Sequence, residues 1–203
     1  TPSNSSAASD VYKRQLKTYK ELPTDPLSSI TSAMAKLEEG EGAVIQILIS
    51  PADNSWQKMG KNFISNTKKQ EADPEKAKFK VDAKTLESIE NKCSKPGFET
   101  SIRIVVCAPN MALAKARLNN IKSAFAQFDS PWNSLSSKKI RFKHSFMIDF
   151  IYRYQPIIWT KGKTILNSEE LASIFHLPNK TVETPNIYWL KSRPAPPPAK
   201  PAR

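Results

Sequence analysis

Residues 98–128 read FETSIRIVVCAPNMALAKARLNNIKSAFAQF and hold the clearest pattern in the chain. Ile102, Ile104 and Val106 fall on one face of a strand that runs from Phe98 to Ala108. Apolar residues then recur every three or four positions, at Met111, Ala114, Leu118, Ile121, Phe125 and Phe128. A helix cannot bury such a stripe alone, so the pattern predicts a strand followed by a long amphipathic helix that packs on a sheet.

The same order of elements occurs earlier, at residues 43–67. The apolar run from Ala43 to Ile49 predicts a strand buried on both faces, and helical spacing follows it. Each unit is preceded by another helix, the first beginning at Asp25-Pro26 and the second capped by Asp82. The sequence therefore predicts an α/β (α+β) fold, a mixed sheet with amphipathic helices mainly on one face. Whether the two β-α halves are related stays open.

The rest of the chain gives weaker signals. We expect a loop at residues 129–137, a basic strand at 138–143, a short helix at 147–154 and an edge strand at 156–160. Asn167 and Glu170 form a capping-box pattern, which predicts a helix that ends before Pro178. Residues 191–203 contain five prolines and no acid, which is typical of an extended polyproline-type linker.

The first residues need a separate interpretation. Residues 5–15, SSAASDVYKRQ, match residue for residue the translation of a common transposase sequencing adapter. We therefore interpret residues 1–15 as translated adapter without folded structure. Residues 16–190 are expected to form the folded α/β domain, either as one unit or as two subdomains, 16–80 and 81–190.

Composition limits the class of function. The 203 residues suffice for one domain or two small ones, and the net charge of +12 favours polyanionic partners such as nucleic acid or acidic lipid. No stretch approaches the roughly 18 consecutive apolar residues of a membrane span. Cys93 and Cys107 lack the spacing of a metal site, so we expect two reduced thiols.

Motifs for catalysis are weak. Gly162-Lys163-Thr164 resembles the end of a phosphate-binding loop, but the position where that motif needs glycine is Ile157, so we interpret the tripeptide as a tight turn. His144 and His176 are far apart and have no partner residues at ligand spacing. The sequence therefore predicts a chain that is not itself an enzyme, with no catalytic, metal-binding or cofactor-binding residue.

The densest basic patch consists of Lys138, Lys139, Arg141 and Lys143. On a strand, three of these side chains share one face, where they could contact the phosphates of a nucleic acid. A sheet edge protected by lysines gives the same pattern. Four aromatic residues are either platforms for base stacking or packing residues, namely Trp132, Trp159, Tyr188 and Trp189.

Residues 25–64, 98–128 and 165–198 together resemble the N-terminal region of a family of large membrane-associated ATPases. These are the type IV secretion or conjugative-transfer ATPases of the HerA/FtsK type from uncultured bacteria with reduced genomes. The most specific stretch is LNSEELASIFHLP at 166–178, followed by SRPAPPP at 192–198, which is similar to the junction before the ATPase core in that family.

This resemblance implies a role for the chain and assigns no catalytic residue to it. It implies that an ATPase domain, which uses ATP and Mg, follows Arg203 in the parent protein. Residues 16–190 would then be an accessory module that docks onto this motor or onto secretion subunits, in a homo-oligomer formed through the motor. The parent would work in the cytoplasm at the inner face of the cell membrane. Assembly or docking of a translocation motor is thus the expected function, and nucleic-acid binding through residues 138–143 is the alternative.

Overall fold

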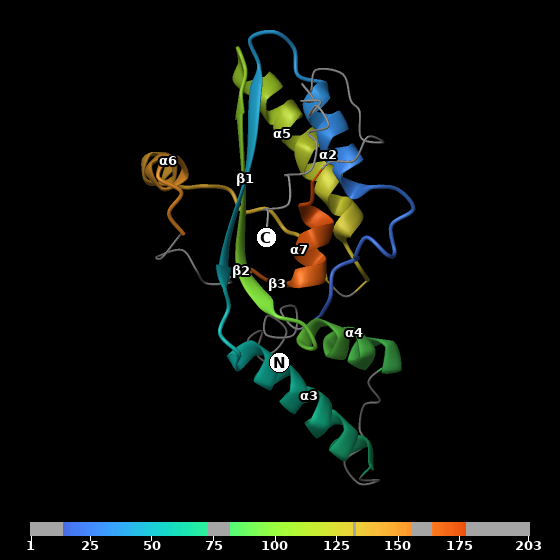
Figure 1. The fold of residues 1–203 in the computed structure, drawn as a ribbon. Helices are drawn as coiled ribbons and strands as arrows, with labels where there is room; N and C mark the ends of the chain where they lie inside the picture. The colour runs from blue at the N-terminus through green and yellow to red at the C-terminus, as the bar shows by residue number, and fades with distance from the viewer. Residues whose placement is uncertain (1–13, 73–81, 132, 156–163, 178–203) are drawn as a thin grey trace, which may run out of the picture.

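The computed structural model describes residues 14–72, 82–131, 133–155 and 164–177. These residues form a three-stranded sheet and six α-helices (Figure 1). The strands are β1 (Gly42–Pro51), β2 (Gly97–Cys107) and β3 (Thr164–Asn167). The helices are α2 (Pro26–Ala35), α3 (Ser55–Ala72), α4 (Ala83–Cys93), α5 (Met111–Phe125), α6 (Lys143–Ile151) and α7 (Ser168–Ile174), and a 3₁₀ turn (Ala126–Phe128) extends α5. The predicted α/β (α+β) class is confirmed.

The sheet has the order β1-β2-β3, and both strand pairs are antiparallel. The prediction of a mixed sheet is therefore wrong for the described strands. Strand β1 pairs with β2 along its whole length, from Gly42 opposite Cys107 to Pro51 opposite Phe98. Because β1 lies at an edge, none of its residues is fully buried. The prediction that residues 43–49 are buried on both faces is therefore wrong.

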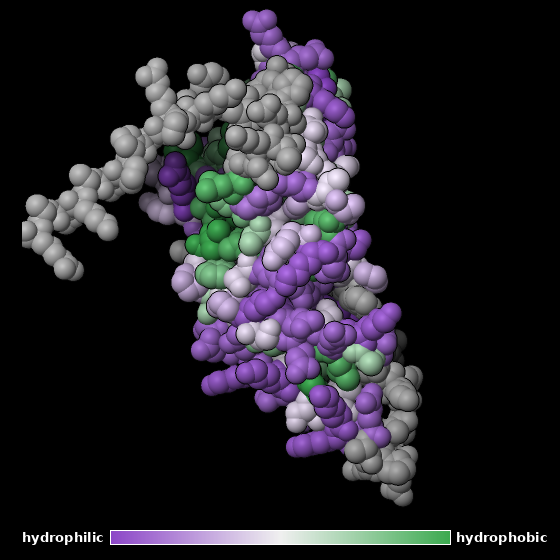
Figure 2. Space-filling view, turned by 45° about the vertical axis from the view of Figure 1, so that its right-hand side comes forward, coloured by the Kyte–Doolittle hydropathy of each residue, from purple (hydrophilic) through white to green (hydrophobic). Residues whose placement is uncertain are grey.

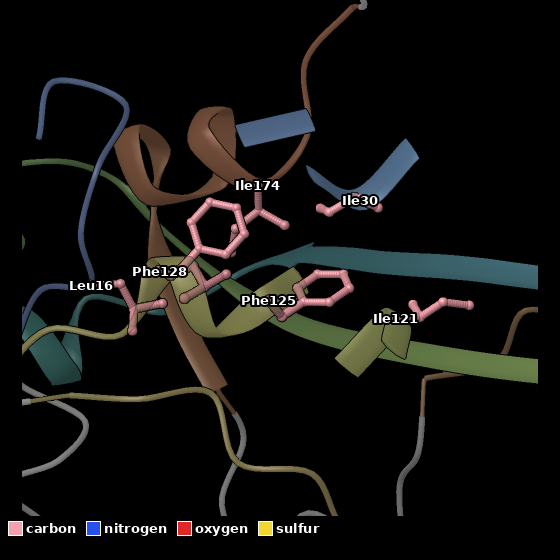
Figure 3. Close-up of a cluster of buried hydrophobic side chains, with 7 residues drawn as sticks. Leu16, Ile30, Ile121, Phe125, Phe128 and Ile174 are labelled. Carbon is pink, nitrogen blue, oxygen red and sulfur yellow. The ribbon is translucent and has the colours of Figure 1, made fainter. Parts of the chain in front are cut away.

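The main core lies between the sheet and the layer formed by α2, α5 and α7 (Figure 1). Ile45 lies opposite Ile104, and Ile47 lies opposite Ile102. These paired residues point to the same face of the sheet, where they pack against the main core. Six of the seven fully buried side chains of this core are labelled in Figure 3: Leu16, Ile30, Ile121, Phe125, Phe128 and Ile174. The helix layer on one face is thus confirmed.

A second, smaller cluster joins α3 to α4 at one end of the sheet (Figure 1). Trp56 of α3 packs so closely on Gly97 that a Cβ at position 97 would lie 2.3 Å from its ring atom Cζ2. Because α3 packs on α4 whereas α5 lies over the sheet, the units at 43–67 and 98–128 do not pack as equivalent halves. The full-length pairing of β1 with β2 also joins residues 16–80 to residues 81–190 in one body. Within the described residues, the two predicted subdomains thus share one sheet.

The predicted helix starts are confirmed by their caps. The side chains of Asp25, Asp82 and Asn110 accept hydrogen bonds from backbone N–H groups of the first helical turns. At α7, Asn167 accepts from the Glu170 N–H at 2.8 Å, and Glu170 accepts from the Asn167 N–H at 2.7 Å. This is the reciprocal capping box that the sequence predicted.

A buried ion pair joins three distant parts of the chain. Lys92 of α4 and Glu170 of α7 are each 1% exposed, and Lys92 Nζ lies 3.2 Å from Glu170 Oε1. The same oxygen accepts the Leu16 N–H at 2.7 Å, and Lys92 also donates to the Arg14 carbonyl at 3.1 Å. Each charge therefore has a counter-charge and further hydrogen bonds, as a buried pair requires.

The N-terminal end of the described chain is part of this fold. Gln15 N–H donates to Ser88 Oγ at 3.2 Å, and Leu16 belongs to the main core. The disorder expected through residue 15 is therefore wrong for Arg14 and Gln15. Residues 1–13 of that prediction lie outside the described residues.

Candidate interaction surface

The four cationic residues predicted as a site lie at the start of α6. Lys138, Lys139 and Arg141 belong to an irregular stretch, and Lys143 is the first residue of the helix. All four are exposed. The predicted strand at 138–143 is wrong, because β1 and β3 already occupy both sides of β2 and this stretch joins neither outer edge. The side chains at 139, 141 and 143 therefore do not share the face of a strand.

Helix α6 lies on the opposite side of the sheet from the helix layer (Figure 1). A short helix was predicted at 147–154. The observed helix begins and ends a few residues earlier, at Lys143 and Ile151. Phe146 and Phe150 are half-buried, and their ring centroids lie 6.0 Å apart. No residue of α6 is fully buried, so this helix has no apolar core of its own.

Polar groups from the sheet hold the end of α6. The Arg103 guanidinium donates to the Asp149 carbonyl at 2.9 Å and to the Tyr154 carbonyl at 2.5 Å. Gln46 of β1 donates to the Phe150 carbonyl at 3.0 Å and accepts from Arg103 at 3.1 Å. The Asp149 and Phe150 carbonyls belong to the last turn of α6, which carries the negative end of the helix dipole, so a cation suits them.

Arg103 is the central residue of this anchor. Its guanidinium also lies 5.9 Å from the ring centroid of Phe146. Burial lowers the pKa of Arg103, and the nearby Asp149 carboxylate acts in the opposite direction. Arg153, which follows the helix cap Tyr152, has a φ of 58° and adopts the left-handed conformation that often ends a helix.

The contact between Arg103 and α6 was not predicted. Arg103 lies within the strand that was predicted at 98–108, and a cation between apolar residues was a signal.

Replacing Arg103 with Met is expected to release α6. The substitution leaves carbonyls of the helix end without their charged donor, and we expect a loss of about 2 kcal/mol of stability. Hydrogen exchange of the amides at residues 146–154 would measure the effect. Arg117→Met is the matched control, because Arg117 pairs with Glu38 and Glu41 and makes none of the contacts that hold α6. Equal protection of α6 in the two variants would contradict the anchor.

We define the α6 segment as residues 138–154. It has five cations (Lys138, Lys139, Arg141, Lys143 and Arg153) against one acid, Asp149. Its exposed large apolar side chains are Ile140, Phe142, Met147, Ile148, Ile151, Tyr152 and Tyr154, with exposures between 41% and 65%. The rings of Tyr152 and Tyr154 stack with centroids 5.7 Å apart. The segment therefore presents apolar and cationic groups together.

Other parts of the described surface give weaker indications of a binding site. A cavity of about 180 Å³ lies between β2, α5 and residues 135–137, below the 300–1,000 Å³ that is usual for small-molecule sites. The face that is turned forward in Figure 2 is mainly hydrophilic, with apolar residues confined to separate patches. Among the residues that the structure describes, no group of three or more potential metal ligands occurs. No helix in those ranges is long and apolar enough to cross a membrane.

Several sequence predictions can be placed. Cys93 is buried at the end of α4, and Cys107 is exposed at the end of β2. His176 lies 2.9 Å from Asp25 and links α7 to the cap of α2, whereas His144 is exposed on α6. Thr164 begins β3. The following predictions lie outside the described residues: Gly162 and Lys163, the strand at 156–160, the linker at 191–203, and the aromatic residues Trp132, Trp159, Tyr188 and Trp189.

Comparison with known proteins gives one match. A family model described as "Domain of unknown function (DUF8128)" matches residues 7–190. The match includes residues 7–15, which lie in the stretch interpreted above as translated adapter. No curated protein and no solved structure matches the chain.

Proposed function

Since the chain belongs to the DUF8128 family of domains of unknown function, we propose that it is a non-catalytic interaction module that docks onto a partner protein through the α6 segment. One observation carries the proposal. Helix α6 is held by Arg103 and Gln46 through polar contacts, while seven large apolar side chains of its segment are exposed.

Exposed apolar groups of this kind favour a protein partner. Burying apolar surface contributes roughly 25 cal/mol per Å², and aromatic, Met and Arg side chains are enriched in protein interfaces. The anchor supports the same conclusion, because it fixes the helix before binding and so reduces the entropy lost on association. The five cations around these side chains fit a partner with an acidic rim, which raises the association rate.

The resemblance to type IV secretion and conjugative-transfer ATPases suggests the identity of the partner. We infer that the module docks onto the ATPase domain of its own parent protein, which would bind ATP and Mg, or onto other secretion subunits. A homo-oligomer would then form through the motor, in the cytoplasm at the inner face of the membrane. The support for this step is the similarity of the stretches at 25–64, 98–128 and 165–198.

The test begins with the gene of the parent protein downstream of Arg203. Finding no ATPase domain there would overturn the proposed partner. If the domain is present, it is produced separately and titrated with this chain by calorimetry. The Ile151→Asp/Tyr152→Asp variant is expected to weaken binding at least tenfold, about 1.4 kcal/mol. Met59→Asp on α3 is the control, because Met59 is similarly exposed, at 54%, on a different element. Equal binding by both variants would contradict docking through α6.

Nucleic-acid binding is the second candidate function. Four exposed cations within residues 138–143 favour it, since phosphate contacts need no fixed strand. DNA affinity measured between low and physiological salt would then fall steeply, and Lys139→Ala/Arg141→Ala would reduce the slope by about one for each phosphate that the variant no longer neutralises. Ile151→Asn, which adds no charge, should leave DNA affinity unchanged, which distinguishes this function from protein docking. A flat salt dependence would exclude it.

A further inference from the structure

The outer edge of β1 is the second unusual surface of the molecule. In the part of the chain that the structure describes, β1 pairs only with β2, so its other side carries unpaired backbone groups. Alternate residues of an antiparallel strand direct N–H and C=O groups away from the neighbour. This edge is ten residues long. Water can solvate these groups, and another strand can pair with the whole row in register.

Strand β1 has few of the features that usually protect an edge. Its sequence, GAVIQILISP, contains no charged residue, and its one proline is the last residue, Pro51. The register with β2 advances one residue at a time from Gly42 to Pro51, so no bulge interrupts it. The other outer strand, β3, has only four residues. Short length thus protects β3, whereas β1 is long, regular and uncharged.

The sequence of β1 is also close to symmetric about its centre. The stretch Ala43 to Ile49 reads AVIQILI, with Gln46 in the middle. In an antiparallel pair of two such strands centred on Gln46, Ile45 of one copy faces Ile47 of the other. Val44 likewise faces Leu48. Apolar groups meet apolar groups at each step, and each face of the sheet continues into the same face of the second copy.

We propose that β1 pairs antiparallel with β1 of a second copy of this chain, around a two-fold axis near Gln46. The two sheets then form one six-stranded sheet with the order β3-β2-β1-β1-β2-β3. Gln46 holds α6 through its side chain, so the anchor leaves the outer backbone edge of β1 unused. Val44 and Ile49, which are 51% and 44% exposed, become covered. This contact uses no residue of the α6 segment and stands independently of the proposed function.

Sedimentation equilibrium of the whole chain over 1–100 μM, roughly the range of ordinary dimers, tests the proposal. We expect a monomer–dimer equilibrium, and Val44→Lys should raise its dissociation constant at least tenfold. The substitution places a lysine opposite the apolar Leu48 at two positions of the paired strands, one on each side of Gln46. Met59→Lys is the matched control on α3 and should leave the equilibrium unchanged. A chain that stays monomeric throughout this range would overturn the proposal. Protection of the β1 edge by another segment of the same chain would give that result. A dimer that Val44→Lys does not weaken would overturn it too.

Cysteine crosslinking tests the register. In a Cys107→Ser background, Gln46→Cys should form a disulfide between two copies, since directly opposed residues lie within the Cα separation that a disulfide needs. Val44→Cys alone should not crosslink, because its partner is Leu48. The double variant Val44→Cys/Leu48→Cys should crosslink, and it avoids changing the α6 anchor. Crosslinking by Val44→Cys alone would exclude the centre at Gln46.

Discussion

Lys92→Met is expected to lower the free energy of unfolding by about 3–5 kcal/mol, as is usual when one partner of a buried ion pair is removed. The substitution leaves the Glu170 carboxylate buried with only the N–H donors of Leu16 and Asn167. Desolvation of that charge then has no counter-charge to offset it. Urea unfolding followed by tryptophan fluorescence would measure the loss.

Two further variants make this result interpretable. Lys95→Met removes a partly exposed lysine that pairs with Glu169, and it should cost less than about 1 kcal/mol. The double variant Lys92→Met/Glu170→Gln removes both charges, so its loss should be smaller than the sum of the two single losses. A Lys92→Met variant as stable as Lys95→Met would contradict the structure at this pair.

Phe128→Ala is expected to cost about 3–5 kcal/mol, the range for truncating a buried aromatic side chain. Phe128 is 0% exposed and packs against Phe125, with ring centroids 6.2 Å apart (Figure 3). The cavity would open in the main core, between the N-terminal segment and α7. The same urea experiment measures the loss, and Phe175→Ala, at a residue that is 58% exposed, is the control. A loss equal to that of the control would show that the core is assembled differently.

Elements with local signals were predictable from the sequence. The stripe at residues 111–128 and the alternation at 98–108 indicated α5 and β2, and the caps at Asp25, Asp82 and Asn167 marked helix starts. Side chains a few residues apart determine these features. The position of β1 was not predictable in this way, because an apolar run looks the same at the centre of a sheet and at its edge. For the same reason, the alternation at 138–143 predicted a strand for which the sheet leaves no place.

The candidate site was predicted only in part. The sequence identified the four cations, but not the exposed apolar groups beside them, because exposure depends on which sheet face each helix covers. The contact of Arg103 with α6 joins residues 46 positions apart, and the Lys92–Glu170 pair spans 78. Glu170 was recognised as a capping residue from its spacing to Asn167. Its second role, as the counter-charge of Lys92, depends on tertiary packing.

The double role of Glu170 has a consequence for how the protein is made. Lys92 leaves the ribosome long before Glu170 does, and during that interval its ammonium has no counter-ion. Packing α4 at that stage would bury an uncompensated charge, so burial of this helix is unfavourable until α7 has been synthesised. Glu170 also binds the backbone of Leu16, 154 residues earlier. The final native state of this domain is therefore reached after translation has passed residue 170, and not progressively from the N-terminus.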